Sequence, residues 1–262
     1  MAISHLFKIQ NEKTVKILDF SDTLEIKFLP EPDWLPAEKK RIFHSGLGLV
    51  EAGFRDAFDE ITPYLIENDV GLYSCDLGPS AERYTRNIPI SPVLDLDAIL
   101  DGIRQSVAFI RERFPGRLAV ENYNYYPTGL YEHVCRPDFI TGTLEELDMG
   151  LVLDISHAAV TAHNLKTEFL DYVKELPLHR LVEIHLARPT FENERRALAL
   201  DAHSAPGLRE YRWLEGILGL LKNDPREIYL VVEYYRHLAR LCDILAAARE
   251  FCEAHAPAIF SI

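Results

Sequence analysis

Several short apolar runs of this sequence end in a side chain that can bind a metal ion. The last or next-to-last position of each run is a carboxylate or an imidazole. An ionised carboxylate buried at the end of an apolar strand is costly unless it is paired, hydrogen-bonded or bound to a metal. Mixed carboxylate and imidazole ligands suit zinc, manganese or ferrous iron. The residues in question are His44, Asp76, Glu121, Asp154, His185 and Glu233.

Two short motifs add further ligands. In DISH, Asp154 and His157 are three residues apart at a predicted strand-to-helix turn, so both can face the same side. In DAH, Asp201 and His203 have the i, i+2 spacing that places two side chains on one face of an extended segment. Each motif alone has a structural explanation, since Asp154 could simply cap a helix that starts near Ser156. Their combination with the strand-end residues favours a metal cluster.

Other polar and aromatic residues near these motifs allow both a functional and a structural interpretation. Arg188, after EIHLA, could bind a substrate carboxylate or pair with a neighbouring acid. His163 and Asn164 could position the turn that carries His157, or be solvated helix residues. Three tyrosines beyond Glu121 could line a substrate pocket or form a surface loop: Tyr123, Tyr125 and Tyr126.

The elements that must position these residues alternate along the chain. Short apolar runs of strand character are separated by longer stretches of helical period, as is typical of βα units around a parallel sheet. About eight such units predict an α/β protein with a (β/α)8 TIM barrel, in which all strands end at one mouth. The strands are predicted at residues 6–9, 24–28, 41–44, 71–76, 118–122, 151–154, 181–186 and 228–233.

The predicted helices lie between these strands. Residues 92–114 have the clearest period, with apolar side chains at every third or fourth position. Long irregular connections are expected at 78–91 and 188–206, after strands, where barrels place their active-site loops. A single domain over residues 1–262 is expected. The other helices are predicted at 51–67, 144–147 with the preceding turn, 165–176, 208–221 and 238–255.

Composition narrows the classes of partner. Asp and Glu number 41 against 28 Lys and Arg, and the resulting net charge of −13 argues against binding nucleic acid. No segment approaches the ~20 apolar residues of a membrane span or has a signal-peptide pattern, so a cytoplasmic location is expected. The four cysteines contain no CxxC pair and are expected to be core thiols.

At these residues the sequence resembles a known family. The phrases FHSGLGL, ENYNYYP, GLVLDISHAAVTAHNL, ELPLHRLVEIHLA, LDAHSAP and VVEY are similar to the motif series of the multinuclear non-heme iron-dependent oxidative enzymes. This family was formerly a bacterial domain of unknown function and belongs to the xylose isomerase-like TIM barrels. The resemblance covers about residues 40–235. The family pattern implies a central, catalytic iron held by Glu121, Asp154, His185 and Glu233, a second iron held by His44, Asp76 and the shared Glu121, and a third held by His157, Asp201 and His203.

The resemblance also implies a reaction. Enzymes of the family use mixed-valent iron and dioxygen to oxidise residues, commonly cysteine, in a ribosomally made precursor peptide that a small partner protein delivers. Two features depart from the family pattern. Asp76 in SCDLGPS stands where the family usually has a histidine, and the first strand lacks the usual Leu-Arg-x-x-His phrase. We therefore expect the second metal site to differ from the corresponding site of the family's other enzymes.

Other functions fit part of the same pattern. Endonuclease IV-type phosphodiesterases have the same order of ligands around three zinc ions, but the negative charge and the lack of a basic stripe disfavour that alternative. Sugar isomerases or epimerases of the xylose isomerase type use Glu, Asp, His and Glu around one divalent metal. A metal-binding or partner-binding barrel without activity is the non-enzymatic alternative.

Overall fold

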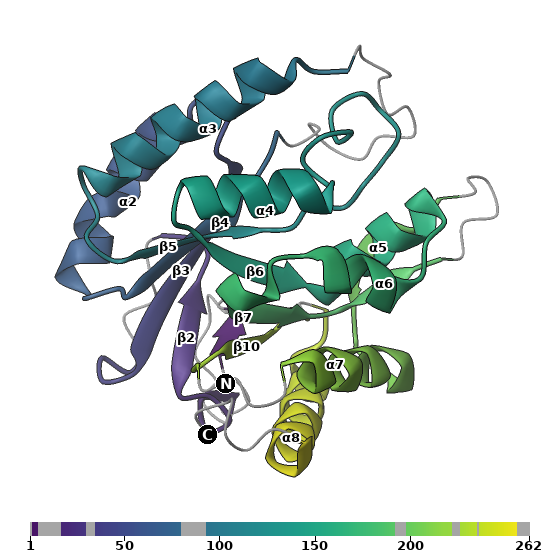
Figure 1. Cartoon of the computed structure of the whole chain (residues 1–262). Helices are drawn as coiled ribbons and strands as arrows, with labels where there is room; N and C mark the ends of the chain where they lie inside the picture. The colour runs from purple at the N-terminus through teal and green to yellow at the C-terminus, as the bar shows by residue number, and fades with distance from the viewer. Residues whose placement is uncertain are drawn as a thin grey trace.

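A closed barrel of eight parallel strands forms the centre of the molecule (Figure 1). The computed structural model describes residues 2–4, 17–29, 35–79, 93–191, 198–221, 226–234 and 236–255. Around the barrel the strands follow chain order, which confirms the predicted TIM barrel. They are β1 (Ala2–Ser4), β2 (Thr23–Ile26), β3 (Lys40–Gly48), β4 (Leu72–Asp76), β5 (Arg117–Glu121), β6 (Gly150–Asp154), β7 (Leu181–Leu186) and β10 (Tyr229–Val232).

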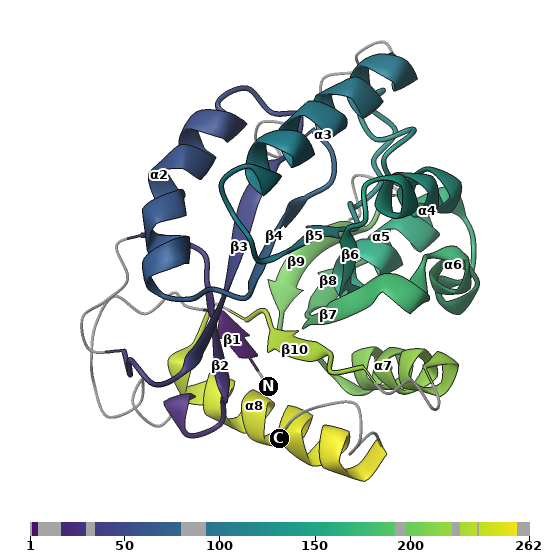
Figure 2. The same cartoon turned by 60° about the vertical axis from the view of Figure 1, so that its left-hand side comes forward.

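Helices cover the outside of this barrel (Figures 1 and 2). In α3 the side chains of Ile99, Ile103, Val107 and Ile110 are buried, and Asp95 caps the first turn by accepting a hydrogen bond from the Ala98 amide. None of the described helices is long and apolar enough to cross a membrane. The helices are α2 (Phe54–Glu67), α3 (Leu96–Arg111), α4 (Pro137–Glu146), α5 (Ile155–Leu165), α6 (Phe169–Glu175), α7 (Leu208–Leu220) and α8 (Leu238–His255), with a 3-10 turn at Leu178–Arg180.

The barrel has an apolar interior of its own, apart from the larger core between strands and helices. Six consecutive strands, β3 to β7 and β10, each contribute one buried aliphatic residue to it. Because these side chains close the inside of the barrel, polar residues nearer the mouth lie on an apolar floor of low dielectric. The floor consists of Ile42, Leu72, Ala119, Val152, Val182 and Val231.

Some predicted elements differ from the structure. The predicted strand 6–9 lies outside the described residues, and β1 pairs with β2 and β10 instead. The predicted helix 165–176 is wrong in its bounds, because α5 runs to Leu165 and α6 starts only at Phe169. Lys166 between them has a left-handed φ of 61°, which ends α5.

The connection predicted as irregular at 188–206 contains an antiparallel hairpin. Its strands are β8 (Arg188–Thr190) and β9 (Leu200–Ser204), and both lie beside α5 (Figure 2). Asn164 of α5 fixes the hairpin, because its side chain accepts a hydrogen bond from the Ala199 amide and donates one to the Ala199 carbonyl. These hydrogen bonds anchor to α5 the hairpin that carries DAH.

Candidate metal centre

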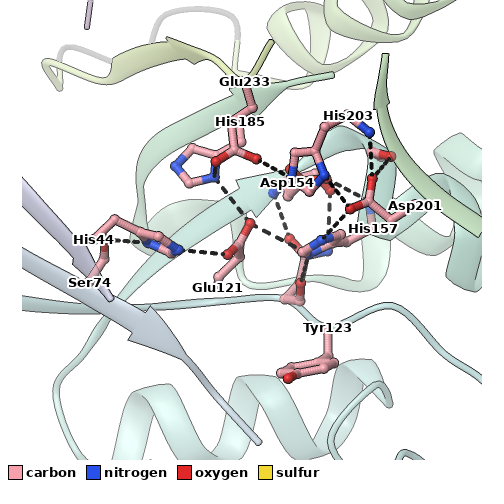
Figure 3. Close-up of polar contacts among 12 residues, drawn as sticks. His44, Ser74, Glu121, Tyr123, Asp154, His157, His185, Asp201, His203 and Glu233 are labelled. Atoms are coloured by element: carbon pink, nitrogen blue, oxygen red, sulfur yellow. Dashed lines mark hydrogen bonds and ion pairs between the residues drawn. The ribbon is translucent and has the colours of Figure 1, made fainter. Parts of the chain in front are cut away.

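The six strand-end residues meet at one mouth of the barrel. Parallel pairing aligns Asp76 with Glu121 across β4 and β5, and Asp154 with His185 across β6 and β7. Five of the six are buried, and Asp76 is partly buried. Figure 3 shows Glu121 between His44 and His185, with Asp154 and the hairpin residues on its other side. The barrel geometry thus brings together side chains that are far apart in sequence.

The central group contains Glu121, Asp154, His185 and Glu233. One possible ligand atom of each lies within 4.8 Å of the others. His185 Nδ1 is 3.1 Å from Glu121 Oε1 and 3.7 Å from Glu233 Oε1. Metal–ligand bonds of about 2.0–2.2 Å separate the atoms around one ion by roughly 3 Å, so these distances suit a shared ion. Asp154 Oδ2 is buried without a hydrogen-bond partner, which a metal ion would supply.

A second group extends the centre toward β3 and β4. His44, Asp76 and Glu121 each offer a ligand atom within the same 4.8 Å limit. His44 Nε2 lies 3.2 Å from Glu121 Oε2, while its Nδ1 lies 2.9 Å from the Ser74 hydroxyl. Because that hydroxyl donates to the Phe43 carbonyl, it accepts from His44 Nδ1, and the ring is held with Nε2 toward Glu121 and the ligand group.

A third group joins α5 to the hairpin. His157, Asp201 and His203 satisfy the same distance limit. His203 Nδ1 lies 2.8 Å and His157 Nε2 lies 3.6 Å from Asp201 Oδ2. The Ser156 hydroxyl donates to the other oxygen of Asp201 at 2.6 Å and so orients the carboxylate. His203, on β9, has a left-handed φ of 40° and reaches Glu233 Oε2 at 2.9 Å, which connects this group to the central one.

Carboxylates in the centre differ in protonation because their neighbours differ. Burial raises the pKa of Asp76 and of Asp154 to about 7. Burial also acts on Glu121, but the histidines around it, His157 foremost, hold its pKa well below the ordinary value. Glu121 is thus the fixed negative charge between the first two groups.

The carboxylates in turn raise the pKa values of the histidines around them. Burial opposes their charge, yet the surrounding carboxylates raise the pKa of His157 and of His185 well above the ordinary value. Hydrogen bonds with Asp201 and Glu233 likewise outweigh burial and raise the pKa of His203 to about 10. Protons on these imidazoles therefore hold the metal-free centre together, and a metal ion must displace them.

Three more polar residues lie beneath the centre, and none was predicted from the sequence. His185 Nε2 contacts Glu183 Oε1 at 3.1 Å and lies 3.7 Å from Glu25 Oε1. Glu25 and Glu183 are fully buried, and Lys27 contacts both Glu25 and Glu233. Glu25 also forms a fourth candidate ligand group with His44 and His185. The signal for Glu183 was its i−2 spacing from His185, which places both on the inner face of β7.

The residues around the mouth mostly have structural roles. Tyr123 and Tyr126 are buried and pack against Tyr131, so the alternative of a surface aromatic loop is wrong for these two; Tyr125 is partly exposed. Asn164 fixes the hairpin rather than the turn of His157, whose Nδ1 lies 3.0 Å from the Asn122 carbonyl. Cysteines 75, 135, 242 and 252 are free thiols, and only Cys242 is partly exposed.

Fold and geometry define a (β/α)8 barrel with grouped candidate metal ligands at the carboxyl ends of its strands. Residues 57–214, more than half of the chain, match the family described as the RiPP precursor modification enzyme MbnB/TglH/ChrH, where RiPP denotes a ribosomally made and modified peptide. The chain belongs to this family.

The chain is also similar to curated proteins. A UPF0276 protein of Caulobacter vibrioides is 26% identical over 177 residues, which cover 68% of this chain and 55% of the relative. A UPF0276 protein of Acaryochloris marina is 29% identical over 117 residues, covering 45% of this chain and 41% of the relative. The chain thus spans about half the length of the curated relatives it matches.

Among solved structures, a xylose isomerase domain protein from Planctomyces limnophilus is similar with a TM-score of 0.63 and 11% identity, over 98% of this chain and 97% of that one. D-psicose 3-epimerase from Clostridium cellulolyticum matches with the same TM-score and 14% identity, over 97% of this chain and 98% of that one. At these identities the likeness shows the xylose isomerase-like fold alone.

Proposed function

We propose that this protein is an iron-dependent oxidative enzyme that modifies a residue, commonly cysteine, of a ribosomally made precursor peptide with dioxygen. The observation that carries the proposal is the central group, in which four buried side chains from four strands converge within 4.8 Å. Membership of a family of precursor modification enzymes supports the peptide as substrate. A small partner protein that delivers the peptide is part of the proposal.

In this proposal Glu121, Asp154, His185 and Glu233 hold the central ion. His44 and Asp76 hold a second ion with Glu121, and the third group holds a third. The donor set contains only oxygen and nitrogen atoms, which suits iron and also admits zinc or manganese. Iron bound there would supply one-electron chemistry and activate dioxygen beside the substrate.

The side chains of this protein orient and protect such a centre. Ser74 orients the ring of His44 through Nδ1, and Glu183 orients that of His185 through Nε2, so the other nitrogen of each ring faces the ligand group. Asp154, His185 and Glu233 are almost inaccessible to water. His203 is 32% exposed, so we propose that the peptide approaches from the hairpin.

Metal analysis of the anaerobically purified protein tests the proposal. We expect two or three tightly bound irons per chain, and dioxygen uptake when the precursor peptide, its partner protein and a reductant are added. Iron that stays bound without any dioxygen uptake would favour the non-enzymatic alternative. Bound zinc together with nicking of an abasic duplex would replace the proposal with the nuclease.

A further inference from the structure

A cavity of about 290 Å³ lies at the hairpin, next to the third ligand group. Ser204 in its wall directly follows His203, and Arg188 comes three residues after His185. Its walls combine two guanidinium groups, two hydroxyl groups and one aromatic ring. The lining residues are Arg188, Pro189, Thr190, Phe191, Ser204 and Arg209.

Arg188 supplies this cavity with a positive charge that a ligand can reach. Its sequence position allowed two interpretations, a ligand for a substrate carboxylate or the partner of a neighbouring acid. Among the described residues the guanidinium of Arg188 makes no hydrogen bond or ion pair, although the backbone of Arg188 pairs with Ser204 in the hairpin, and the side chain is exposed. The second interpretation therefore finds no acid among these residues, and the charge is available to a ligand.

Arg209, which also lines the cavity, is held in place. Its guanidinium lies over the rings of Phe191 and Trp213, at 4.5 and 5.0 Å from their centroids, and its Nε donates to Glu210 Oε1 at 2.9 Å. The other oxygen of Glu210 accepts from the Gly207 amide at 2.9 Å. Among the described residues, two arginines therefore face the cavity and one buried carboxylate, Glu210, pairs with Arg209, so this part of the wall is net positive.

We propose that this cavity binds a carboxylate of the peptide substrate, with an apolar side chain of the same peptide against Phe191. Two arginines with nearby hydroxyls match the geometry of a carboxylate, and arginine can bind it through two parallel hydrogen bonds. The net charge of −13 would otherwise repel an acidic peptide, so a local positive site is needed to hold one. This inference rests on the proposed function and assigns a subsite to it.

Both a free C-terminus and an acidic side chain provide a carboxylate. The test therefore uses four capped dipeptides: acetyl-Gly-Phe with a free carboxylate, its amide, acetyl-Glu-Phe amide and acetyl-Gln-Phe amide. Calorimetry or NMR titration of the metal-loaded protein at low salt gives their dissociation constants. We expect one carboxylate probe to bind at least about tenfold more tightly than its neutral counterpart. The probe that does so shows whether the cavity takes a free C-terminus or an acidic side chain.

Arg188→Gln should abolish that difference, and Arg188→Lys should restore part of it, because lysine keeps the charge without the paired donors. Arg212→Gln is the matched control, since Arg212 is an exposed arginine of α7 that does not line the cavity. It should bind the probes like the wild type. Thermal unfolding checks that all three variants fold.

Equal binding of charged and neutral probes, or an undiminished preference in Arg188→Gln, would overturn the inference. The Arg188 variants also separate cavity binding from direct ligation of a metal ion by the probe. Absence of bound metal would count against the proposed function alone, because the same titration can then be made on the protein as purified and does not depend on turnover.

Discussion

Asp154 has two separable roles, and replacing it by Asn or by Ala distinguishes them. One carboxylate oxygen, Oδ1, accepts a hydrogen bond from the His157 amide at 2.6 Å and caps α5. The other, Oδ2, is buried without a hydrogen-bond partner and is the oxygen that remains for the central ligand group, of which Asp154 is a member. Asn keeps an oxygen for the cap and removes the charged ligand, whereas Ala removes both.

The expected sizes of the two effects differ. Loss of an N-cap costs about 0.5–2 kcal/mol, and each kcal/mol corresponds to roughly 2–4 °C in Tm for a domain of this size. Structural zinc sites with four ligands bind with about 10–16 kcal/mol, so one ligand contributes roughly 3 kcal/mol, or about 10²-fold in affinity. Asp154→Asn should therefore lose about 10²-fold in metal affinity without losing the cap, and Asp154→Ala should lose both.

Two measurements separate these effects. Thermal unfolding of the metal-free proteins reports the cap, and metal content with chelator competition reports the ligand. Asp95 is the matched control, because it caps α3 by accepting from the Ala98 amide at 2.8 Å but is exposed and outside every ligand group. Asp95→Ala should lower Tm by a similar amount with metal content unchanged. Wild-type metal content and chelator resistance in folded Asp154→Asn would refute the assignment of Asp154 as a ligand.

Three further predictions concern the same centre. His185→Ala should remove the central ion, whereas His203→Ala should lose less metal, as metal counts per chain would show; equal losses would contradict separate sites. Glu183→Gln should weaken metal binding about 10–100-fold in chelator competition, because the amide orients His185 less firmly; unchanged affinity would exclude that positioning role. The metal-free protein should lose stability between pH 7 and about 10, because His203 has its pKa raised to about 10 and holds a proton in the folded state that the unfolded state releases above about 6.5. Asp154, with its pKa raised to about 7, adds a loss of stability that is complete just above pH 7. Thermal unfolding of the metal-loaded protein over the same pH range should show a smaller decline in stability.

Much of the fold followed from local patterns. The barrel was predictable because alternating apolar runs and helical periods repeat along the chain, and α3 shows the period in full. The gap between α5 and α6 was missed, since the left-handed turn at Lys166 interrupts a sequence whose apolar residues continue. The hairpin was missed because β8 has only three residues and because the hairpin is held at Ala199, just before β9, by Asn164, a contact distant in sequence.

Some residues of the site could also be predicted from the sequence, and others could not. Residues at strand ends were recognisable because metal-binding side chains after apolar runs are unusual, and the structure brings all nine predicted ligands into three groups. Their role as ligands stays a prediction. Glu25 and Lys27 gave no such signal, because a charged residue in a short strand is common and only barrel closure shows that it points inward.

For this protein, the sequence by itself determined which side chains end the strands, because a parallel barrel sends every strand end to the same mouth. Only the tertiary structure decided how these side chains divide into groups, which nitrogen of His44 and His185 faces the predicted ligand group, and that the Arg188 side chain has no acid beside it among the described residues. Those properties depend on distances between strands and on a hairpin folded over the mouth, and spacing along the chain does not contain them.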